Sequence, residues 1–451
     1  MVFLPLFFLA ALADGPGHYD FSGPLAGFMV DGGIPGASTS GIEFKLTATN
    51  GGAMLAPTEF DLTNADWKSP LHVILSDAKI DAGHLKAHFH FKNSTGSVLE
   101  GLRLDSSGVV ESYVDASGAA PETKTRMEPA ALPTPLLFGD LQPDAEATPA
   151  DVDLGPITFS PTATQVAIGF KLSGLTYVKA FRPEADYTGG RLSVDPKGLL
   201  CAQDSHGLWR MNPDGSMPQL AAKFGNQTDT AIVDPSNGDI VGSASNSKRY
   251  QRYTAGGDDK GLCPTDAEFQ SWPRQPRIAS NGDLYLKVGD AIIVLRGDKI
   301  FKHVGGIPSV NVVDGDAYFD VAEDGTIYDP VPAGIFKIDP TGKTAKRITF
   351  GPDWHLGRVT NVTGVRLDSS GNLYVLEGTA DGRTENPRVS VFDKTGHFVR
   401  VFGRAGKAAA DRDFLPGSMG TGVTDIAFGT DGTVYICCLP LGPQISIFKP
   451  F

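Results

Sequence analysis

The most regular pattern of apolar and polar positions lies in the C-terminal half of the chain, where short alternating runs are separated by glycine-containing turns. It is clearest between residues 364 and 403, which carry the runs Gly-Val-Arg-Leu, Leu-Tyr-Val, Arg-Val-Ser-Val-Phe and Phe-Val-Arg-Val-Phe. Alternation with a period of two predicts strands that bury one face, and the turns ending in Gly371 and Gly396 predict hairpins between them. The segment therefore predicts four consecutive antiparallel strands.

The first of these turns recurs along the chain, so the four-strand segment is one copy of a repeat. The turn glycines are Gly198, Gly238, Gly282, Gly325, Gly371 and Gly432, at spacings of roughly 40, 44, 43, 46 and 61 residues. Asn-Gly and Asp-Gly, found at several of these turns, suit a two-residue hairpin with positive φ. Repeats of four short strands at this spacing are typical of β-propeller blades, and six copies predict a six-bladed ring.

Residues 364–403 resemble the NHL repeat family. The family pattern is an apolar pair, Asp, a turn Gly, apolar-Tyr-Val, then an apolar strand ending in Phe-Asp-x-x-Gly and a closing Phe-Gly. The other repeats match in part, so the resemblance covers about residues 176–451. The segment departs from the usual pattern at Leu376-Glu377, where many NHL blades place Ala-Asp. The sequence has no Gly-His…Trp-Asp signature, which argues against a WD40 propeller.

The two ends of the predicted ring indicate how it closes. The last repeat ends with the run 445–448 and has no room for a fourth strand. The segment 177–181, just before the first repeat, resembles the fourth strand 398–402. We predict that it pairs with the last blade, because an unpaired strand edge exposes hydrogen-bonding groups. The long final spacing indicates either an insertion at 404–422 or merely a long loop there.

The first part of the chain, residues 15–174, carries a strand pattern without a repeat. Alternating runs at 42–46, 85–91, 102–105, 157–159 and 166–170 are separated by Gly, Pro, Asn and Ser. This pattern predicts an antiparallel β-sandwich of the immunoglobulin-like type. The proline-rich segment 129–161 is either a linker or a loop and edge strand of this sandwich, and the run at 157 favours the latter. The predicted fold class is thus all-β, with a sandwich at 15–174 followed by a six-bladed propeller at 175–451.

Residues 1–13 are apolar throughout and end in Ala11-Leu-Ala13, as the apolar core and cleavage site of a signal peptide do. A truncated gene or a buried strand is the alternative. The stretch is too short to cross a bilayer as a helix, and no other stretch of the sequence predicts a transmembrane segment. We therefore expect a secreted, periplasmic or cell-surface protein.

The four cysteines, Cys201, Cys263, Cys437 and Cys438, lack the spacing of a zinc site. The neighbours Cys437 and Cys438 should point to opposite sides of their strand, so at most one of them is expected in a core. A disulfide to Cys263 is an open alternative in an oxidising compartment.

Charge is divided unevenly along the chain. Residues 1–175 hold 20 Asp and Glu against 9 Lys and Arg, whereas the rest holds 32 against 30. The NHL family includes RNA-binding propellers, but these need a basic face, and the sequence shows none. Nucleic acid and anionic membranes are therefore not expected as partners. The expected partner is a protein, a glycan or a small molecule.

Propellers usually bind ligands around the central channel, on the loops that join the second strand to the third and the fourth to the next first strand. The candidate binding residues on these loops are Asp204, His206, Lys287, Asp329, Asp353, His355 and Glu377. Carboxylates around one channel could hold a divalent cation such as Ca²⁺, with Asp329 and Glu377 as candidate ligands. The candidates for catalytic proton transfer are His206, His355 and Glu377.

Two functions remain open from the sequence. In the first, the propeller is a binding or interaction platform, and the loop Asp and Asn side chains cap their own backbone turns. The second follows from a resemblance: gluconolactonase-like and streptogramin-lyase-like propellers are similar six-bladed rings that use a channel metal or a His/Glu pair. That resemblance implies a metal-assisted lactonase or lyase. No catalytic motif of either family is intact in the sequence, which favours the platform.

Two further patterns have simple interpretations. His88 and His90 share one strand face with Lys86 and Lys92, whose charge would repel a cation, so a solvated face is expected there. Asn93-Ser-Thr95 fits the glycosylation pattern, as do the sequences at Asn226 and Asn361, and it matters only in a eukaryotic secretory host.

Overall fold

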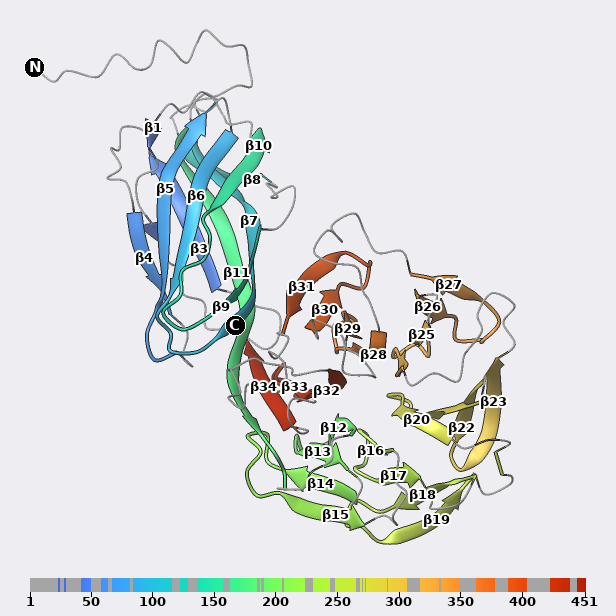
Figure 1. The fold of residues 1–451 in the computed structure, drawn as a ribbon. Coiled ribbons are helices and arrows are strands. Elements are labelled where there is room, and N and C mark those ends of the chain that lie inside the picture. Colours follow the sequence, from blue (N-terminus) through green and yellow to red (C-terminus); the bar gives the residue numbers. More distant parts are fainter. Residues whose placement is uncertain are drawn as a thin grey trace, which may run out of the picture. The chain divides into compact units, whose positions relative to one another are not determined.

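The structure is a computed structural model of the chain, and it describes residues 23–451 with gaps. The gaps are 25–27, 30–41, 50–57, 64–66, 82–83, 116–121, 129–135, 157–162, 185–186, 188–189, 205–206, 224–229, 244–247, 265–267, 270, 272, 290, 306–316, 332–333, 349–361, 378–387, 404–421 and 439–443. The described residues form strands and turns but no helix, so they contain no helical segment that could cross a membrane. The all-β prediction is confirmed (Figure 1).

The chain divides into two compact units. Unit 1 comprises residues 1–176 together with Pro450 and Phe451, and unit 2 comprises Tyr177–Lys449. The sequence predicts the boundary between the two domains at 174/175 and assigns the last residues of the chain to the propeller. The predicted signal peptide and the predicted run 157–159 lie outside the described residues.

The residues of unit 1 that the structure describes form two antiparallel sheets. The first has the order β1–β5–β6–β10, with β4 also on β5. Its strands are β1 (Gly23–Pro24), β4 (Thr58–Leu62), β5 (Leu71–Asp81), β6 (His84–Asn93) and β10 (Ala150–Pro156). The second joins β2–β3–β11 and adds β7 to β11, with β8 and β9 on β7. Its strands are β2 (Phe28–Met29), β3 (Ile42–Thr49), β7 (Leu99–Asp115), β8 (Glu122–Glu128), β9 (Leu136–Leu141) and the part of β11 (Ala163–Phe181) before residue 177.

Aromatic side chains from the two sheets of unit 1 meet in its core. The ring of Phe89 lies 5.2 Å from that of Phe170, and the rings of Phe91 and Phe138 are 4.6 Å apart. The strands predicted at 42–46, 85–91, 102–105 and 166–170 are confirmed by β3, β6, β7 and β11. The proline-rich segment contains β9 and the edge strand β10, as favoured from the sequence. The immunoglobulin-like type of this unit stays a prediction.

The predicted solvated face of β6 carries paired histidines. The Nε2 atom of His90 lies 3.4 Å from the Oε2 atom of Glu146, and His88 pairs with Asp151 of β10. Both histidine side chains are partly exposed. In contrast, Asn93 at the end of β6 is fully buried. Its amide donates hydrogen bonds to the carbonyls of residues 97, 141 and 142, so this glycosylation pattern is part of the interior.

The last two residues of the chain, which follow unit 2 in the sequence, belong to unit 1. Phe451 is buried. Its N–H donates to the Gly174 carbonyl at 3.2 Å, and its carbonyl accepts the N–H of Gly174 at 3.4 Å. Its ring lies 4.8 Å from that of Trp67. A Cβ atom on Gly174 would lie 2.7 Å from the Phe451 ring, so a glycine is needed at this close approach. Unit 1 is thus built from residues on both sides of unit 2 in the sequence.

Unit 2 is a β-propeller. Its described residues form five four-stranded antiparallel sheets, blades 1 to 5, each with its strands in chain order. Blade 1 is β12 (Leu192–Val194), β13 (Leu200–Gln203), β14 (Gly207–Met211) and β15 (Gln219–Lys223). Blade 2 is β16 (Ala231–Val233), β17 (Ile240–Ser243), β18 (Tyr250–Tyr253) and β19 (Asp259–Cys263). Blade 3 is β20 (Pro273–Ile278), β21 (Leu284–Val288), β22 (Ala291–Arg296) and β23 (Lys299–Gly305).

The remaining blades complete the ring. Blade 4 is β24 (Asp320–Val321), β25 (Ile327–Val331), β26 (Gly334–Ile338) and β27 (Ala345–Arg347). Blade 5 is β28 (Val362–Leu367), β29 (Leu373–Glu377), β30 (Arg388–Phe392) and β31 (Phe398–Phe402). The closing blade is β32 (Val423–Phe428), β33 (Val434–Cys438) and β34 (Gln444–Pro450), with β11 next to β34. The first strands of the blades lie nearest the middle of the ring (Figure 1).

The end of β11 confirms the predicted closure. The segment 177–181 is the last part of β11, the strand that neighbours β34, and the rings of Tyr177 and Phe448 are 5.6 Å apart. The closing blade packs against blade 1 through a cluster that includes Leu200, Ile445 and Ile447. Similar clusters lie between blades 1 and 2, 2 and 3, and 3 and 4. The predicted insertion at 404–422 lies, except for its last residue, outside the described residues.

The repeated turns differ in length from the prediction. All six repeat glycines have positive φ, between 79° and 84°. In blade 1, however, Gly198 N–H donates to the Asp195 carbonyl and Asp195 N–H donates to the Leu199 carbonyl, both at 2.9 Å, so the loop is longer than two residues. The Asp195 carboxylate accepts the N–H groups of Lys197 and Leu199 at 2.8 and 2.9 Å. This carboxylate stabilises the longer turn, and Asp368 does the same in blade 5.

All four cysteines are free and buried. The expectation that at most one of Cys437 and Cys438 lies in a core is wrong, because both have no exposed surface. A blade inside a propeller packs against a neighbour on each face, so both sides of β33 are covered. The alternative of a disulfide to Cys263 is not realised in the structure.

Candidate functional site

The candidate residues Lys287 and Asp329 form a buried ion pair. Lys287 lies on β21 of blade 3 and Asp329 on β25 of blade 4. The Lys287 Nζ atom donates to the Asp329 Oδ1 atom at 3.2 Å, and both side chains are at most 4% exposed. Burial raises the pKa of Asp329, and Lys287 opposes that rise. The ammonium group of Lys287 thus takes the position next to Asp329 that a cation would need.

Glu377, the second candidate metal ligand, is bonded within its own blade. It ends β29 and is 2% exposed. Its Oε1 atom accepts hydrogen bonds from the Ser390 hydroxyl at 2.6 Å and from Arg388 Nε at 3.2 Å, both on β30. The carboxylate is therefore neutralised by a cation of the neighbouring strand.

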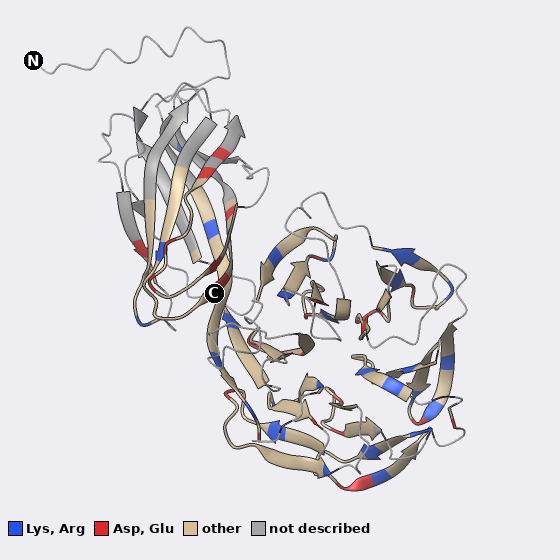
Figure 2. Ribbon diagram, viewed as in Figure 1, with Lys and Arg blue, Asp and Glu red and all other residues tan. Residues whose placement is uncertain are grey.

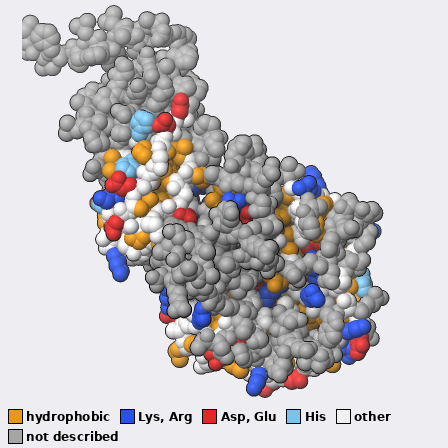
Figure 3. All heavy atoms as spheres, in the orientation of Figure 1, with side chains coloured by type: hydrophobic (Ala, Val, Ile, Leu, Met, Phe, Trp, Pro, Cys, Tyr) orange, Lys and Arg blue, Asp and Glu red, His pale blue; other side chains and the backbone are white. Residues whose placement is uncertain are grey.

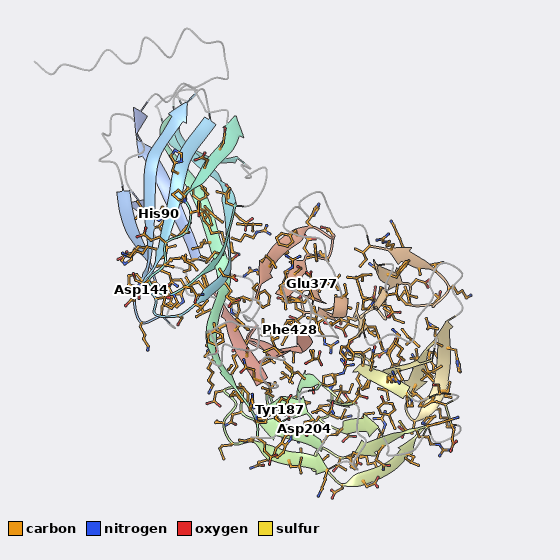
Figure 4. The ribbon with its side chains drawn as sticks, viewed as in Figure 1. His90, Asp144, Tyr187, Asp204, Glu377 and Phe428 are labelled. Atoms are coloured by element: carbon orange, nitrogen blue, oxygen red, sulfur yellow. The ribbon has the colours of Figure 1, made fainter. Side chains whose placement is uncertain are left out.

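Asp204 has the role of a turn residue. It follows β13, it is fully buried, and its Oδ1 atom accepts the N–H of Gly207 at 3.1 Å. Figure 4 shows Asp204 and Glu377 on different blades, well apart from each other. His206, Asp353 and His355 lie outside the described residues, so their roles stay predictions. Within the described residues, no group of three His, Cys, Asp or Glu side chains converges as a metal site would require.

The structure instead brings charged residues of the first strands together in the middle of the ring. Three are arginines and two are aspartates, from every blade except blade 2. They are Arg191 next to β12, Arg277 on β20, Asp320 on β24, Arg366 on β28 and Asp425 on β32. We call these five residues the arginine centre. None of the arginines is more than 7% exposed, and Asp425 has no exposed surface.

Asp425 and Arg366 are fully bonded within the arginine centre. Arg366 donates to the Asp425 carboxylate, and its Nε atom donates to the carbonyl of Ile426 at 3.1 Å. Asp425 also accepts the N–H groups of Leu192 and Ile426 at 3.0 and 2.8 Å. This pair joins blade 5, blade 1 and the closing blade.

Arg277 and Asp320 form a looser pair. Their Nε and Oδ1 atoms are 3.4 Å apart, and Arg277 Nε also donates to the carbonyl of Phe319 at 3.1 Å. Burial raises the pKa of Asp320 to about 6. Burial, followed by the nearby charge of Arg191, lowers the pKa of Arg277 to about 10, so this arginine stays cationic at neutral pH. The Nη2 atom of Arg277 has no hydrogen-bond partner among the described residues.

Arg191 is the least satisfied member of the arginine centre. Its guanidinium carbon lies 3.3 Å from the centroid of the Tyr318 ring, and its Nη1 atom is 3.7 Å from the Asp425 Oδ2 atom. None of its three side-chain nitrogens has a hydrogen-bond partner in the described part of the chain, although the residue is only 2% exposed. A buried guanidinium without hydrogen bonds is costly, because it has lost its water without replacement.

The arginine centre was not predicted, although the sequence carries a signal for it. Each of the five residues lies in the first strand of its repeat or next to it, a short distance before the turn glycine. The distance is five positions for Arg277, Asp320 and Arg366, and seven positions for Arg191 and Asp425. Each charge alone looks like an ordinary surface residue of an alternating strand. Only alignment of the repeats by their glycines would have placed them at one level of one channel.

A basic cavity was missed as well. It has a volume of about 250 Å³ and lies between blades 4 and 5. Its charged lining residues are Lys337, Lys346, Arg347, Asp393 and Lys394. Figure 2 shows the basic residues of β27, and Figure 3 shows Lys and Arg side chains gathered at the same edge of the propeller. This cluster is not evident in the sequence, because its members come from two blades.

No protein-family model matches the sequence, and no curated protein does. Several solved structures are similar at low identity. A streptogramin B lyase is 16% identical with a TM-score of 0.40, over 62% of this chain and 98% of that one. A gluconolactonase from Xanthomonas campestris is 15% identical with a TM-score of 0.43, over 62% and 90%. A protein of unknown function from Bacteroides thetaiotaomicron is 10% identical with a TM-score of 0.46, over 97% and 99%. Similarity at this level carries no argument about function.

Proposed function

We propose that this protein is exported and that its propeller, a six-bladed NHL-like ring, is a platform that binds a protein, a glycan or a small molecule. The observation that carries the proposal is the bonding of the two candidate metal ligands, one of which, Glu377, is also a catalytic candidate. Asp329 is paired with Lys287, and Glu377 is bonded to Arg388 and Ser390. A metal ligand or general base needs a free carboxylate aimed at a reacting group, and these two carboxylates are bonded to the protein itself.

The alternative is a metal-assisted lactonase or lyase. It depends on His206 and His355, which lie outside the described residues, acting together with Glu377. In that case Glu377 would have to exchange its bond to Arg388 for a bond to a metal or a substrate. The buried ion pair makes such an exchange unfavourable, because it would leave the guanidinium of Arg388 without its carboxylate.

Metal analysis and a lactone assay on the full chain separate the two functions. We expect elemental analysis and calorimetry to give no stoichiometric Ca²⁺, and we expect no hydrolysis of gluconolactone above the buffer rate. Glu377→Ala and the exposed control Glu184→Ala should then behave alike in both assays. Stoichiometric metal, or a lactonase rate, that Glu377→Ala removes and Glu184→Ala keeps would overturn the binding proposal.

A further inference from the structure

We propose that the arginine centre of the propeller binds the carboxylate group of a small organic ligand, with Arg191 as its main donor. The inference rests on the proposed function, since it names the ligand chemistry of the binding platform. It concerns residues that none of the sequence patterns had assigned to a site.

The arginine centre has unused hydrogen-bonding capacity. None of the three side-chain nitrogens of Arg191 has a hydrogen-bond partner among the described residues, although Nη1 lies 3.7 Å from Asp425 Oδ2, and Arg191 is almost fully buried. Arg277 adds an Nη2 atom that also lacks a hydrogen-bond partner there. Buried polar groups in native proteins are bonded in the great majority of cases. Arg366, in the same centre, follows that rule with bonds to Asp425 and to three carbonyls. Within the arginine centre, the unused donors therefore belong to Arg191 and Arg277 and not to Arg366.

Arg191 is held in one orientation by an aromatic ring. Its guanidinium carbon lies over the Tyr318 ring at 3.3 Å, a separation at which the face of the group rests on the ring. The N–H groups lie in the guanidinium plane, so they point away past the ring rather than into it. Stacking thus fixes the plane of the donors before a ligand arrives. A planar fork of N–H groups matches the two oxygens of a carboxylate.

The net charge of the arginine centre also favours an anion. The arginine centre contains three guanidinium groups and two carboxylates, so one positive charge is in excess when both carboxylates are ionised. A carboxylate ligand carries one negative charge and would neutralise that excess. Sulfate, with two charges, would exceed it, and chloride could not accept two parallel hydrogen bonds. The centre therefore favours a singly charged, planar anion.

Thermal unfolding of the full-length protein with simple anions tests the inference. Sodium acetate and sodium formate are titrated against sodium chloride and sodium sulfate at matched ionic strength. A ligand that binds only the folded state raises the melting temperature in a saturable way. We expect saturation with acetate and formate at lower concentrations than with chloride or sulfate. Saturation with chloride or sulfate at concentrations equal to or below those of acetate and formate would overturn the inference, whereas the non-saturating stabilisation that sulfate gives to most proteins would not count as binding.

Variants locate the effect. In Arg191→Met the half-saturating acetate concentration should rise about tenfold or more, as expected for loss of charge-assisted hydrogen bonds. Arg191→Lys keeps the positive charge but loses the planar pair of N–H donors, so it should also weaken acetate binding. This variant replaces Arg191→Met in the test if the methionine variant does not fold. Arg347→Met, an exposed cation in the basic cavity, is the control and should leave the titration unchanged. An acetate effect lost in Arg347→Met, or unchanged in both Arg191 variants, would contradict the assignment.

The result can be separated from the fate of the proposed function. Metal-dependent lactone hydrolysis removed by Glu377→Ala would overturn the binding function, whatever acetate does. If that hydrolysis is not found and acetate has no saturable effect, the arginine centre is structural and only this inference fails.

Discussion

The Nζ atom of Lys287 lies 3.2 Å from the Oδ1 atom of Asp329, and together these two side chains form a buried ion pair between blades 3 and 4 of the propeller. The second oxygen of Asp329 has no partner among the described residues. From their sequence positions, both residues are predicted to belong to a binding face. In the structure they bond to each other, so we expect their substitution to change the stability of the fold.

Removing one member of this pair should destabilise the fold more than removing both. Lys287→Met leaves the Asp329 carboxylate buried and unpaired, which should lower the free energy of unfolding by about 3–5 kcal/mol. The double variant Lys287→Met with Asp329→Leu should lower it by only about 1 kcal/mol, because it leaves no uncompensated charge. Urea unfolding of the single and double variants measures both values. Additive losses would show that the two side chains are not coupled.

Asp320 should make stability depend on pH. Its pKa of about 6 in the folded protein is above its ordinary value of 3.8, so the folded chain holds this proton more tightly than the unfolded chain does. Its contribution to stability therefore falls as pH rises from about 4 to about 6 and is constant above that. The free energy of unfolding of the wild type, relative to Asp320→Asn, should fall by about 3 kcal/mol across this window.

A second aspartate provides the control for this pH dependence. Hydrogen bonds from Thr326 lower the pKa of the exposed Asp324. The stability of the wild type relative to Asp324→Asn should therefore change in the opposite direction, decreasing only as pH falls through the acid range. Unfolding curves at intervals between pH 3 and pH 8 give both differences. A flat difference for Asp320 between pH 4 and pH 7 would contradict the assigned pKa.

The four thiols should be unreactive in the folded protein. All are buried, and burial raises the pKa of Cys263 to about 11 and that of Cys201 and Cys438 to about 12. The thiolate is the reactive form, so both access and ionisation oppose reaction. A chromogenic disulfide reagent should titrate no thiol in the native protein and all four after unfolding without reductant. Fewer thiols after unfolding would reveal a disulfide.

Asn93 should be important for the stability of unit 1 and should carry no glycan. Asn93→Asp replaces an amide that donates to three carbonyls with a carboxylate that can only accept. Buried acceptors would then face one another, so we expect the free energy of unfolding to fall by about 2–4 kcal/mol. Gln219→Glu, the same chemical change at an exposed position, should have almost no effect. Intact-mass measurement after expression in a eukaryotic secretory host would detect a glycan at Asn93, and finding one would contradict its burial.

Much of the propeller could be predicted because its signal is local. A strand that buries one face alternates, and a turn that needs positive φ selects glycine, so both features can be read without knowing any tertiary contact. The closure by residues 177–181 followed from the same reasoning, since a ring with a missing strand needs one from elsewhere.

The site could not be predicted in the same way, because it depends on which blades face one another. Arg191 and Tyr318 belong to blades that are far apart in the sequence, and only ring closure brings them into contact. Similarly, Glu377 is a candidate ligand in the sequence, whereas the neighbouring strand supplies Ser390 and Arg388 as its partners. Residue type at a loop position indicates what a side chain can do, but the facing residue decides whether it is free to do so.

The division of the chain has a consequence for biosynthesis. Unit 1 includes residues that precede the propeller and also Pro450 and Phe451, which follow it. A ribosome therefore completes all of unit 2 before it supplies the phenylalanine that packs on Trp67 and pairs with Gly174. Synthesis of unit 1 begins first but ends only with the last two residues of the chain. The sheets of unit 1 therefore lack Pro450 and Phe451 until the whole propeller has been synthesised.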